Sequence, residues 1–325
     1  YLNPDIGLTG DAADTFALLA DLLDAKGVLR HQSISNEILK GLSRLSGVIY
    51  RQEGNIQVAE HRASSTLTKA PRLDELDLSQ YRQAGFGVGV ITKLGWYTST
   101  VEEPSTDPGK SHSEQELRIS NSVEQVVNEV KRLKNQYNLS EFFFIDQAFN
   151  QPPDFAKALC TSLITENLNI KWNTNITTHG PDGELISLMS KAGCQMVLIG
   201  GPVISNGNRQ ELSINLKSSL EQMITLCDLC QNHGLPYSIT QGFGELGETD
   251  ETISLKLTGL SQVAGKDRMA HVNIRIGNRL LPGSPLIESA KQDGLIKEEK
   301  DLLMPAFYVD PSVRSNIVEK LQSAA

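Results

Sequence analysis

The feature that most limits how this chain can fold is a repeat of strand-like and helix-like segments that begins at Gly87. Short runs of apolar and β-branched residues alternate with longer amphipathic segments, a pattern typical of parallel sheets with helical crossovers. The expected strands are 87–92, 141–146, 170–177, 195–200, 236–243 and 269–277, and the expected helices are 122–138, 152–167, 182–193, 216–234, 250–265 and 284–294. Nearly continuous apolar runs at 142–145 and 196–199 indicate strands buried on both faces.

Six strand–helix units are two fewer than a closed eightfold barrel needs. The sequence therefore predicts an α/β fold, an open partial (βα)6 barrel with parallel strands, in preference to a doubly wound sheet. In both folds ligands bind at the carboxyl ends of the strands. Polar residues and glycines gather at these ends: Thr92, Lys93, Asp146, Gln147, Asn150, Asn173, Asn175, His179, Gly200, Gly201, Gln241, Glu245, Arg275, Asn278 and Arg279. Capping and solvation of loop ends explain part of this set without any ligand.

The residues before the repeat form a small α+β segment. An amphipathic helix is expected over 14–27, with Asp14 and Thr15 at its start, and a hairpin over 47–60 around a turn at Glu53–Asn55. Residues 63–80 lack periodicity and suit a surface linker. The segment holds too little core for an independent domain. We expect three parts: residues 1–80 as the tail of a larger domain with a linker, 81–292 as the barrel, and 293–325 as a C-terminal extension.

Composition narrows the partners and the compartment. The net charge is −9, which disfavours nucleic acid and anionic membranes, because phosphate binding needs clustered Lys and Arg. No run approaches the roughly 18 apolar residues of a membrane span, and the first residues lack the pattern of a signal peptide. Four cysteines are too few for a disulfide framework in a chain of 325 residues, so a reducing cytoplasm is the expected location.

Several stretches between residues 81 and 313 resemble the radical S-adenosylmethionine (SAM) superfamily, in its cobalamin-dependent subclass. They are TKLG (92–95), FFFIDQAFNQPPDFAKALC (142–160), LMSKAGCQMVLIGG (188–201), GFGELGETDETI (242–253), RIGNRLLPGSPLIESAKQDGLI (275–296) and DLLMPAFYVDPSV (301–313). Residues 4–23 resemble the end of that subclass's cobalamin-binding domain and the helix after it. The main body of that domain is not in this sequence, so the resemblance implies cobalamin only if an upstream domain exists.

The resemblance also implies a CxxxCxxC motif in the loop after the first strand, where three thiolates hold a four-iron cluster. In this chain Trp96, Thr100 and Glu103 stand at those positions. We therefore expect no iron–sulfur cluster at this loop and predict no other metal site. A site built from the CxxC of Cys227 and Cys230 is a weaker alternative to buried structural cysteine, because this CxxC lies within an expected helix.

SAM itself remains a candidate cofactor by resemblance. Asp146 matches the position that holds the SAM amino group, whereas the acidic residue of the ribose turn is absent from IGGPV (199–203). A salt bridge is the competing explanation for Asp146, and capping of the helix from Asp250 is the competing explanation for Glu248. The candidate residues are Asp146, His179 and Arg275 for catalysis; Asp146, Asn175, Gly200, Gly201, Gly242, Gly244 and Glu248 for cofactor binding; and Asn150, Gln241 and Arg279 for substrate binding.

The sequence leaves open whether the protein is an enzyme. One hypothesis is a divergent tailoring enzyme, related to methyltransferases, that acts on a small molecule or peptide in secondary metabolism without the usual cluster. The alternative is a non-catalytic relative that binds a metabolite or pairs with an active homologue as a subunit. A third class, a radical enzyme with relocated cluster ligands, is disfavoured by the cysteine positions. The fold does not choose among them, because function depends on the site.

Overall fold

A computed structural model describes residues 5–9, 13–25, 36–60, 73, 76–78, 87–93, 121–203, 209–264, 270–284 and 286–324 of the chain. The chain divides into two compact units, Tyr1–Pro71 and Arg72–Ala325. Each unit has its own hydrophobic core. No helix among the described residues is long and apolar enough to cross a membrane.

The first unit is a small antiparallel sheet with two helices. Its strands β1 (Ile6–Leu8), β2 (Val48–Gln52) and β3 (Asn55–Val58) lie in that order, and its helices are α1 (Ala13–Ala25) and α2 (Asn36–Leu42). The hairpin turn consists of Glu53 and Gly54, both with positive φ, as two-residue hairpin turns require. Asn55 pairs with Gln52 as part of the ladder, so its expected place in the turn was wrong.

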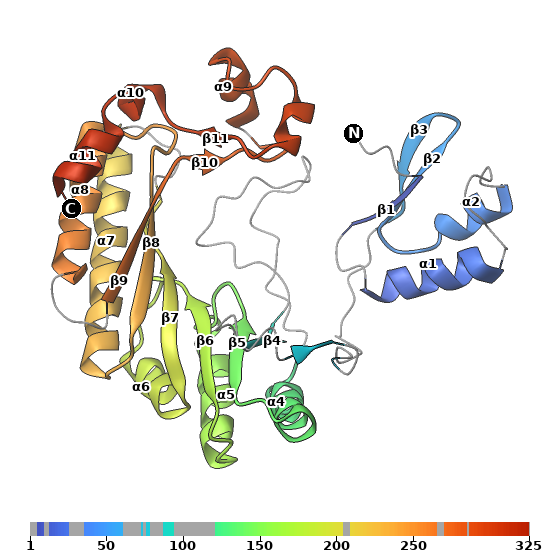
Figure 1. Cartoon of the computed structure of the whole chain (residues 1–325), viewed down its shortest axis with the longest axis horizontal. Helices are drawn as coiled ribbons and strands as arrows, with labels where there is room; N and C mark the ends of the chain where they lie inside the picture. Colours follow the sequence, from blue (N-terminus) through green and yellow to red (C-terminus); the bar gives the residue numbers. More distant parts are fainter. Residues whose placement is uncertain are drawn as a thin grey trace. The chain divides into compact units, whose positions relative to one another are not determined.

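The second unit contains the expected parallel sheet. Its strands are β4 (Val88–Ile91), β5 (Glu141–Ile145), β6 (Lys171–Ile176), β7 (Cys194–Gly200), β8 (Tyr237–Phe243) and β9 (Ala270–Ile276). All neighbouring strands are parallel and the spatial order follows the sequence, β4-β5-β6-β7-β8-β9 (Figure 1). The prediction of an α/β fold with an open, partial barrel is therefore confirmed.

Helices cover one face of this sheet. They are α4 (Val123–Tyr137), α5 (Pro153–Thr165), α6 (Gly183–Lys191), α7 (Arg209–Asn232) and α8 (Asp250–Ala264), and they pack on it through a continuous apolar core (Figure 1). Helix α4 begins as a Ser-initiated capping box should, with Ser122 and Gln125 bonded reciprocally. Helix α7 starts seven residues before the expected Leu216, since the polar run that precedes Leu216 continues the helix instead of forming a loop.

The opposite face of the sheet is much less buried. In β5, Phe142 and Phe144 are buried on the helix side, whereas Ile145 is 49% exposed. The apolar run at 142–145 therefore does not mark a strand buried on both faces, and that prediction was wrong for β5. A run of consecutive apolar residues shows how hydrophobic a strand is but not which neighbours reach each face. We refer below to this side as the uncovered face, defined by the strand residues that point away from α4–α8.

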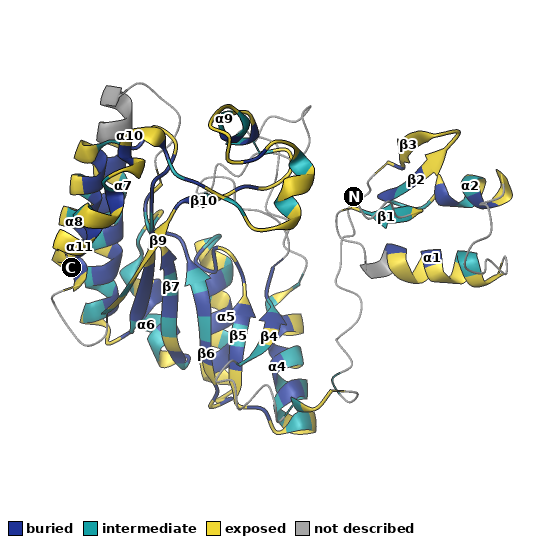
Figure 2. Ribbon diagram, turned by 45° about the horizontal axis from the view of Figure 1, so that its top comes forward, coloured by how far each residue is buried: buried dark blue, intermediate teal, exposed yellow. Residues whose placement is uncertain are grey.

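The C-terminal residues belong to the same compact unit as the sheet. Strand β10 (Asn278–Arg279) pairs antiparallel with β11 (Phe307–Tyr308), and the 3-10 helix η2 (Glu299–Leu303) and helix α9 (Leu286–Gln292) lie between them in sequence. The last helices, α10 (Pro311–Arg314) and α11 (Ile317–Ala324), place Val313, Ile317 and Leu321 in the main core. Burial is mapped in Figure 2.

Gly193, in the connection between α6 and β7, allows a test of how closely the backbone packs there. Its φ is +94°, and a Cβ built on it would lie 2.1 Å from the carbonyl oxygen of Ile170. We expect Gly193→Ala to lower the free energy of unfolding by more than about 2 kcal/mol, because it adds a backbone clash to an unfavourable φ. Gly234→Ala is the matched control. Its φ is +64° with nothing within 4 Å, so a cost of about 1 kcal/mol is expected in urea unfolding. Equal costs for the two variants would contradict the clash.

Candidate functional site

The parallel register brings the carboxyl ends of β4 to β9 to one edge of the sheet. Most of the residues expected to bind ligands lie at this edge or in the loops that follow it. The residues at 94–120, which include Trp96, Thr100 and Glu103, lie outside the described part of the chain, so the expectation for that loop remains a prediction.

Asp146, directly after β5, forms a buried ion pair with Lys93, which follows β4. Lys93 Nζ lies 2.8 Å from Asp146 Oδ2, and the two side chains are 1% and 5% exposed. Thr92 donates its hydroxyl to the same oxygen at 2.6 Å, and the backbone N–H of Ala148 donates to Asp146 Oδ1 at 3.0 Å. Both carboxylate oxygens therefore have partners within the protein. The salt-bridge explanation of Asp146 is the arrangement that the structure contains.

Lys93 lies at the carboxyl edge of the sheet, and the sequence alone did not show that it is the partner of Asp146. Its ammonium also donates to the carbonyls of Ala148 and Phe149, at 3.2 and 3.0 Å, and lies over the rings of Phe149 and Phe155. Burial lowers the pKa of Lys93, while its charge interaction with Asp146 opposes that change. The pair joins the first two strands at the point where the 94–120 segment begins.

Asn150 and His179 lie in the loops after β5 and β6. The side-chain amide of Asn150 is bonded twice to the backbone of Thr177, donating to the carbonyl at 2.8 Å and accepting from the N–H at 2.9 Å. Asn150 therefore fastens these two loops to each other. His179 is exposed. Asn175, on β6, donates to the carbonyl of Asp146 at 2.9 Å.

Gln241 in β8 ties the loop after β7 to its neighbour. Its side-chain N–H groups donate to the carbonyls of Pro202 and Gly242, at 2.8 and 2.9 Å. A Cβ on Gly201 would lie 2.2 Å from Gln241 Oε1, so a larger residue at position 201 would displace the Gln241 side chain. Oε1 itself is buried and has no hydrogen-bond partner among the described residues. Gly200 differs from Gly201, because a Cβ added to it would meet open space.

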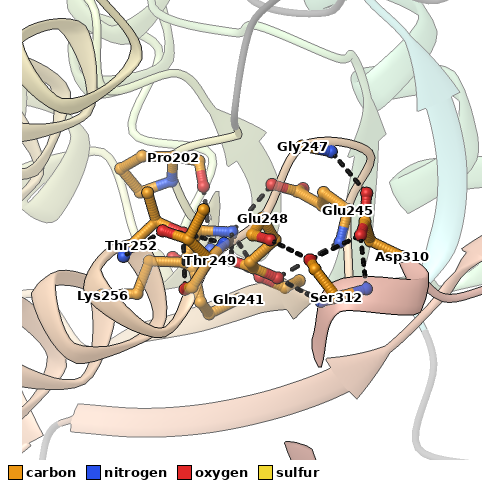
Figure 3. Close-up of polar contacts among 12 residues, drawn as sticks. Pro202, Gln241, Glu245, Gly247, Glu248, Thr249, Thr252, Lys256, Asp310 and Ser312 are labelled. Carbon is orange, nitrogen blue, oxygen red and sulfur yellow. Dashed lines mark hydrogen bonds and ion pairs between the residues drawn. The ribbon is translucent and has the colours of Figure 1, made fainter. Parts of the chain in front are cut away.

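The loop after β8 is built around a second buried lysine. Lys256 on α8 is fully buried, and its ammonium lies 2.7 Å from both Glu245 Oε2 and Glu248 Oε1 and 3.0 Å from the carbonyl of Gly242 (Figure 3). Glu248 also accepts from the backbone N–H groups of Gly244 and Glu245. Burial raises the pKa of Glu248, an effect that the neighbouring charge of Lys256 opposes.

Glu248 does not cap helix α8, so the capping alternative was wrong. Thr249 caps it instead, because its hydroxyl accepts from the N–H of Thr252 at 3.3 Å. The signal for Lys256 was present in the sequence. It lies in the stripe of α8 that also holds Ile253, Leu260 and Val263, where a lysine needs a buried partner.

The C-terminal segment holds the same loop from the other side. Asp310 accepts from the N–H of Gly247 at 2.8 Å, and Ser312 donates its hydroxyl to the carbonyl of Glu248 at 2.7 Å (Figure 3). The N–H of Asp310 donates to the carbonyl of Gly244 at 3.0 Å. Backbone and side-chain bonds to its partners lower the pKa of Asp310 against the effect of burial, which is the largest single influence. The loop after β8 is thus fixed by both its own helix and the C-terminus.

Arg275 and Arg279 occupy different surroundings. Arg275 is exposed on β9, where it pairs in register with Gly242 of β8. Arg279 is exposed on β10, opposite Phe307 of β11. The structure records no contact among Asp146, His179 and Arg275, the three residues expected to be catalytic. Their catalytic roles remain predictions.

All four cysteines lie in the core between the sheet and its helices, not at the carboxyl edge. Cys160, Cys194, Cys227 and Cys230 are each at most 5% exposed. Burial raises the pKa of Cys160 and of Cys230 to about 12 and raises that of Cys194 well above its usual range. Among the described residues, no group of three or more His, Cys, Asp or Glu side chains could hold a metal ion.

Comparison with known proteins identifies solved structures that share this fold. No family model matches the chain. Two structures of the radical S-adenosylmethionine methyltransferase TsrM from Kitasatospora setae align with TM-scores of 0.68 and 0.69 at 17% identity, over 99% of this chain and 68% and 67% of theirs. The cobalamin-dependent S-adenosylmethionine radical enzyme OxsB aligns with a TM-score of 0.64 at 16% identity, over 98% of this chain and 52% of its own. The chain has the fold of these radical SAM enzymes.

The expected resemblance to the cobalamin-dependent subclass is therefore confirmed at the level of fold. One TsrM structure holds cobalamin and a 4Fe-4S cluster, and the other holds a tryptophan substrate and a SAM analogue. An uncharacterized methyltransferase from Pyrococcus horikoshii is 23% identical over 182 residues, which are 54% of this chain and 38% of that protein. The chain thus spans well under half the length of this curated relative.

The buried Lys93–Asp146 pair allows a test of Asp146, the residue that best matches a SAM-binding position of the radical SAM superfamily. We expect Asp146→Ala to lower the free energy of unfolding by about 3–5 kcal/mol, because it leaves a buried ammonium without its counter-ion. The double variant Lys93→Met/Asp146→Leu should cost less than the sum of Lys93→Met and Asp146→Leu measured singly. A urea-unfolding double-mutant cycle checks this, and strict additivity would show that the pair does not interact energetically.

Lys256→Met is expected to be equally damaging, at about 3–5 kcal/mol near neutral pH, because Glu245 and Glu248 would then face each other in the core without a cation. Lys217→Met on the exposed side of α7 serves as the control and should stay within about 0.5 kcal/mol.

The Lys256→Met penalty should shrink in acid. A carboxyl whose pKa is raised by folding contributes stability that is present below its unfolded pKa and is lost as the pH rises through its folded pKa. Removing Lys256 removes the charge that opposes the upward shift of the Glu248 pKa. Unfolding measured from pH 4 to pH 8 should therefore show the variant losing stability, relative to the wild type, as the pH rises. A penalty independent of pH would contradict this account.

Proposed function

We propose that this chain is a cluster-free, radical-SAM-like protein that binds a small molecule or peptide at the uncovered face of its sheet, with SAM as its candidate cofactor. The class of reaction would be methyl transfer or a related tailoring step in secondary metabolism. The radical SAM methyltransferase fold and the partial match to an uncharacterized methyltransferase support this assignment of class.

One observation carries the cluster-free part of the proposal. The four cysteines of the chain are at 160, 194, 227 and 230, so the segment 94–120 contains none. The cysteines that exist are buried between sheet and helices, where raised pKa values disfavour the thiolate that an iron ligand requires. These residues do not fit a three-thiolate cluster at the carboxyl edge of the sheet.

The edge fits SAM only in part. Asp146, Asn150 and Gln241 are committed to contacts within the protein. Gly200 and Gly242 lie at the ends of β7 and β8 on the uncovered face, and neither position has a side chain to obstruct a ligand. SAM bound here would meet backbone and the exposed polar side chains of β8 and β9. Cobalamin would need a domain beyond the residues of this chain.

A non-catalytic role is the second candidate. Asp146 is buried in an ion pair, His179 is exposed in a loop and Arg275 is exposed on β9, and no contact joins them. Such a protein would bind a metabolite, or would serve as a partner subunit of an active homologue. It would retain the fold because the packing of the helices on the sheet does not depend on chemistry at the carboxyl edge.

Anaerobic reconstitution followed by SAM titration tests the proposal. After incubation with iron and sulfide and removal of excess reagent, the protein should stay colourless, and calorimetry should then detect SAM binding. A visible absorption band of a four-iron cluster, at one cluster per protein chain, would overturn the cluster-free assignment. Absence of SAM binding would overturn the cofactor assignment and favour the non-catalytic candidate. Lys217→Gln, which alters charge on the helix side of the sheet, provides the control protein.

A further inference from the structure

The strands β8 and β9 carry an exposed polar row on the uncovered face. Val272 packs toward the helices, so its neighbours His271, Asn273 and Arg275 point to the other side. In register, Thr240 of β8 lies beside Asn273, and Gly242 lies beside Arg275. Figure 2 shows most of β9 as exposed. These side chains are therefore available to a ligand at the carboxyl end of the two strands.

Arg275 is a cation without an ion-pair partner among the described residues. Its neighbours on the uncovered face of β7 and β8 are the uncharged Leu198, Gly200, Ser238, Thr240 and Gly242. The carboxylate of Glu245 lies close to Gly242, but its charge is already paired with Lys256. A guanidinium on this hydrogen-bonding surface can bind a planar carboxylate, because two parallel N–H groups match its two oxygens.

The side-chain amide of Asn273 complements this charge. Its side-chain N–H donates to the hydroxyl of Ser238 at 2.9 Å. The other end of the amide, Oδ1, is therefore presented as an acceptor, and its residue is exposed. Residues two apart in a strand lie on the same face, and their Cα atoms are about 7 Å apart. A long side chain such as that of Arg275 can span this distance. The Asn273 Oδ1 acceptor thus lies on the same face as the guanidinium of Arg275.

From this juxtaposition we propose that β8 and β9 form a binding site for the head group of an α-amino acid, with Arg275 receiving the carboxylate and Asn273 Oδ1 receiving the ammonium. Thr240 supplies a further hydroxyl beside Asn273. The inference rests on the proposed small-molecule site and names the class of molecule that it takes. The same head group occurs in a free amino-acid substrate and in the methionyl part of SAM, and the two sources are separated by the experiment.

Three ligands that share a phenyl group but differ in their charged groups measure what the head group contributes to the affinity. Calorimetry on the full chain would compare L-phenylalanine with 3-phenylpropanoate, which lacks the ammonium, and 2-phenylethylamine, which lacks the carboxylate. Phenylalanine should bind at least about tenfold more tightly than either, as loss of one charge-assisted contact implies. Arg275→Gln should weaken phenylalanine about tenfold and leave phenylethylamine unchanged. Asn273→Leu should weaken phenylalanine and leave phenylpropanoate unchanged. Lys217→Gln should change none of the affinities.

A second titration, with SAM and with 5′-methylthioadenosine, separates the sources. If SAM supplies the head group, phenylalanine competes with SAM, and Arg275→Gln weakens SAM about tenfold but not methylthioadenosine. If a free amino acid supplies it, phenylalanine binds to SAM-saturated protein and Arg275→Gln weakens phenylalanine alone. Both results support the site.

The inference is overturned if Arg275→Gln leaves the affinities of both phenylalanine and SAM within about twofold, or if neither molecule binds the wild type. Its failure is distinguishable from failure of the proposed cofactor. Phenylalanine binding that depends on Arg275 without any SAM binding leaves the amino-acid site intact and removes SAM. SAM binding that is indifferent to Arg275, without phenylalanine binding, removes the amino-acid site and keeps the cofactor.

Discussion

The packing of α4–α8 against one face of the parallel sheet is the constraint on which the rest of this structure depends. It buries Phe142 and the stacked rings of Phe144 and Trp172, together with all four cysteines. Because the helices take up the apolar side chains of one face, the other face is left to polar and partly exposed residues. The ligand site proposed for the uncovered face would therefore be a consequence of where the core lies.

Two buried lysines hold the carboxyl edge of this sheet at opposite sides. Lys93 pairs with Asp146 where β4 and β5 end, and Lys256 pairs with Glu245 and Glu248 where β8 ends. Buried ion pairs are weak evidence for net stability, because desolvation offsets much of the attraction. Their effect is geometric, since each ammonium also donates to backbone carbonyls of the loop beside it and so fixes the loops that leave the sheet. The C-terminal Asp310 and Ser312 add a further constraint on the β8 loop.

Because of these ion pairs, the residues that match cofactor-binding positions of radical SAM enzymes make contacts within the protein. Asp146 and Glu248 are the acidic residues that resemble cofactor ligands most, and both have internal cations as partners. The exposed hydrogen-bonding groups lie instead on β8 and β9, at Thr240, Asn273 and Arg275. The fold is shared with TsrM and OxsB, whereas the side chains left exposed at the carboxyl edge depend on this chain's own ion pairs.

The sequence by itself determined the six strands, the helices between them and the parallel topology, because strand and helix periodicities are local and crossover connections permit few arrangements. It also determined that 94–120 holds no cysteine. Only the tertiary structure decided which face of β5 is buried, that Lys93 and Lys256 pair with Asp146, Glu245 and Glu248, and that Arg275 lies beside Gly242 with no ion-pair partner in the described part of the chain. Those outcomes depend on side chains that are distant in sequence and meet only when the sheet is assembled, so no local pattern encodes them.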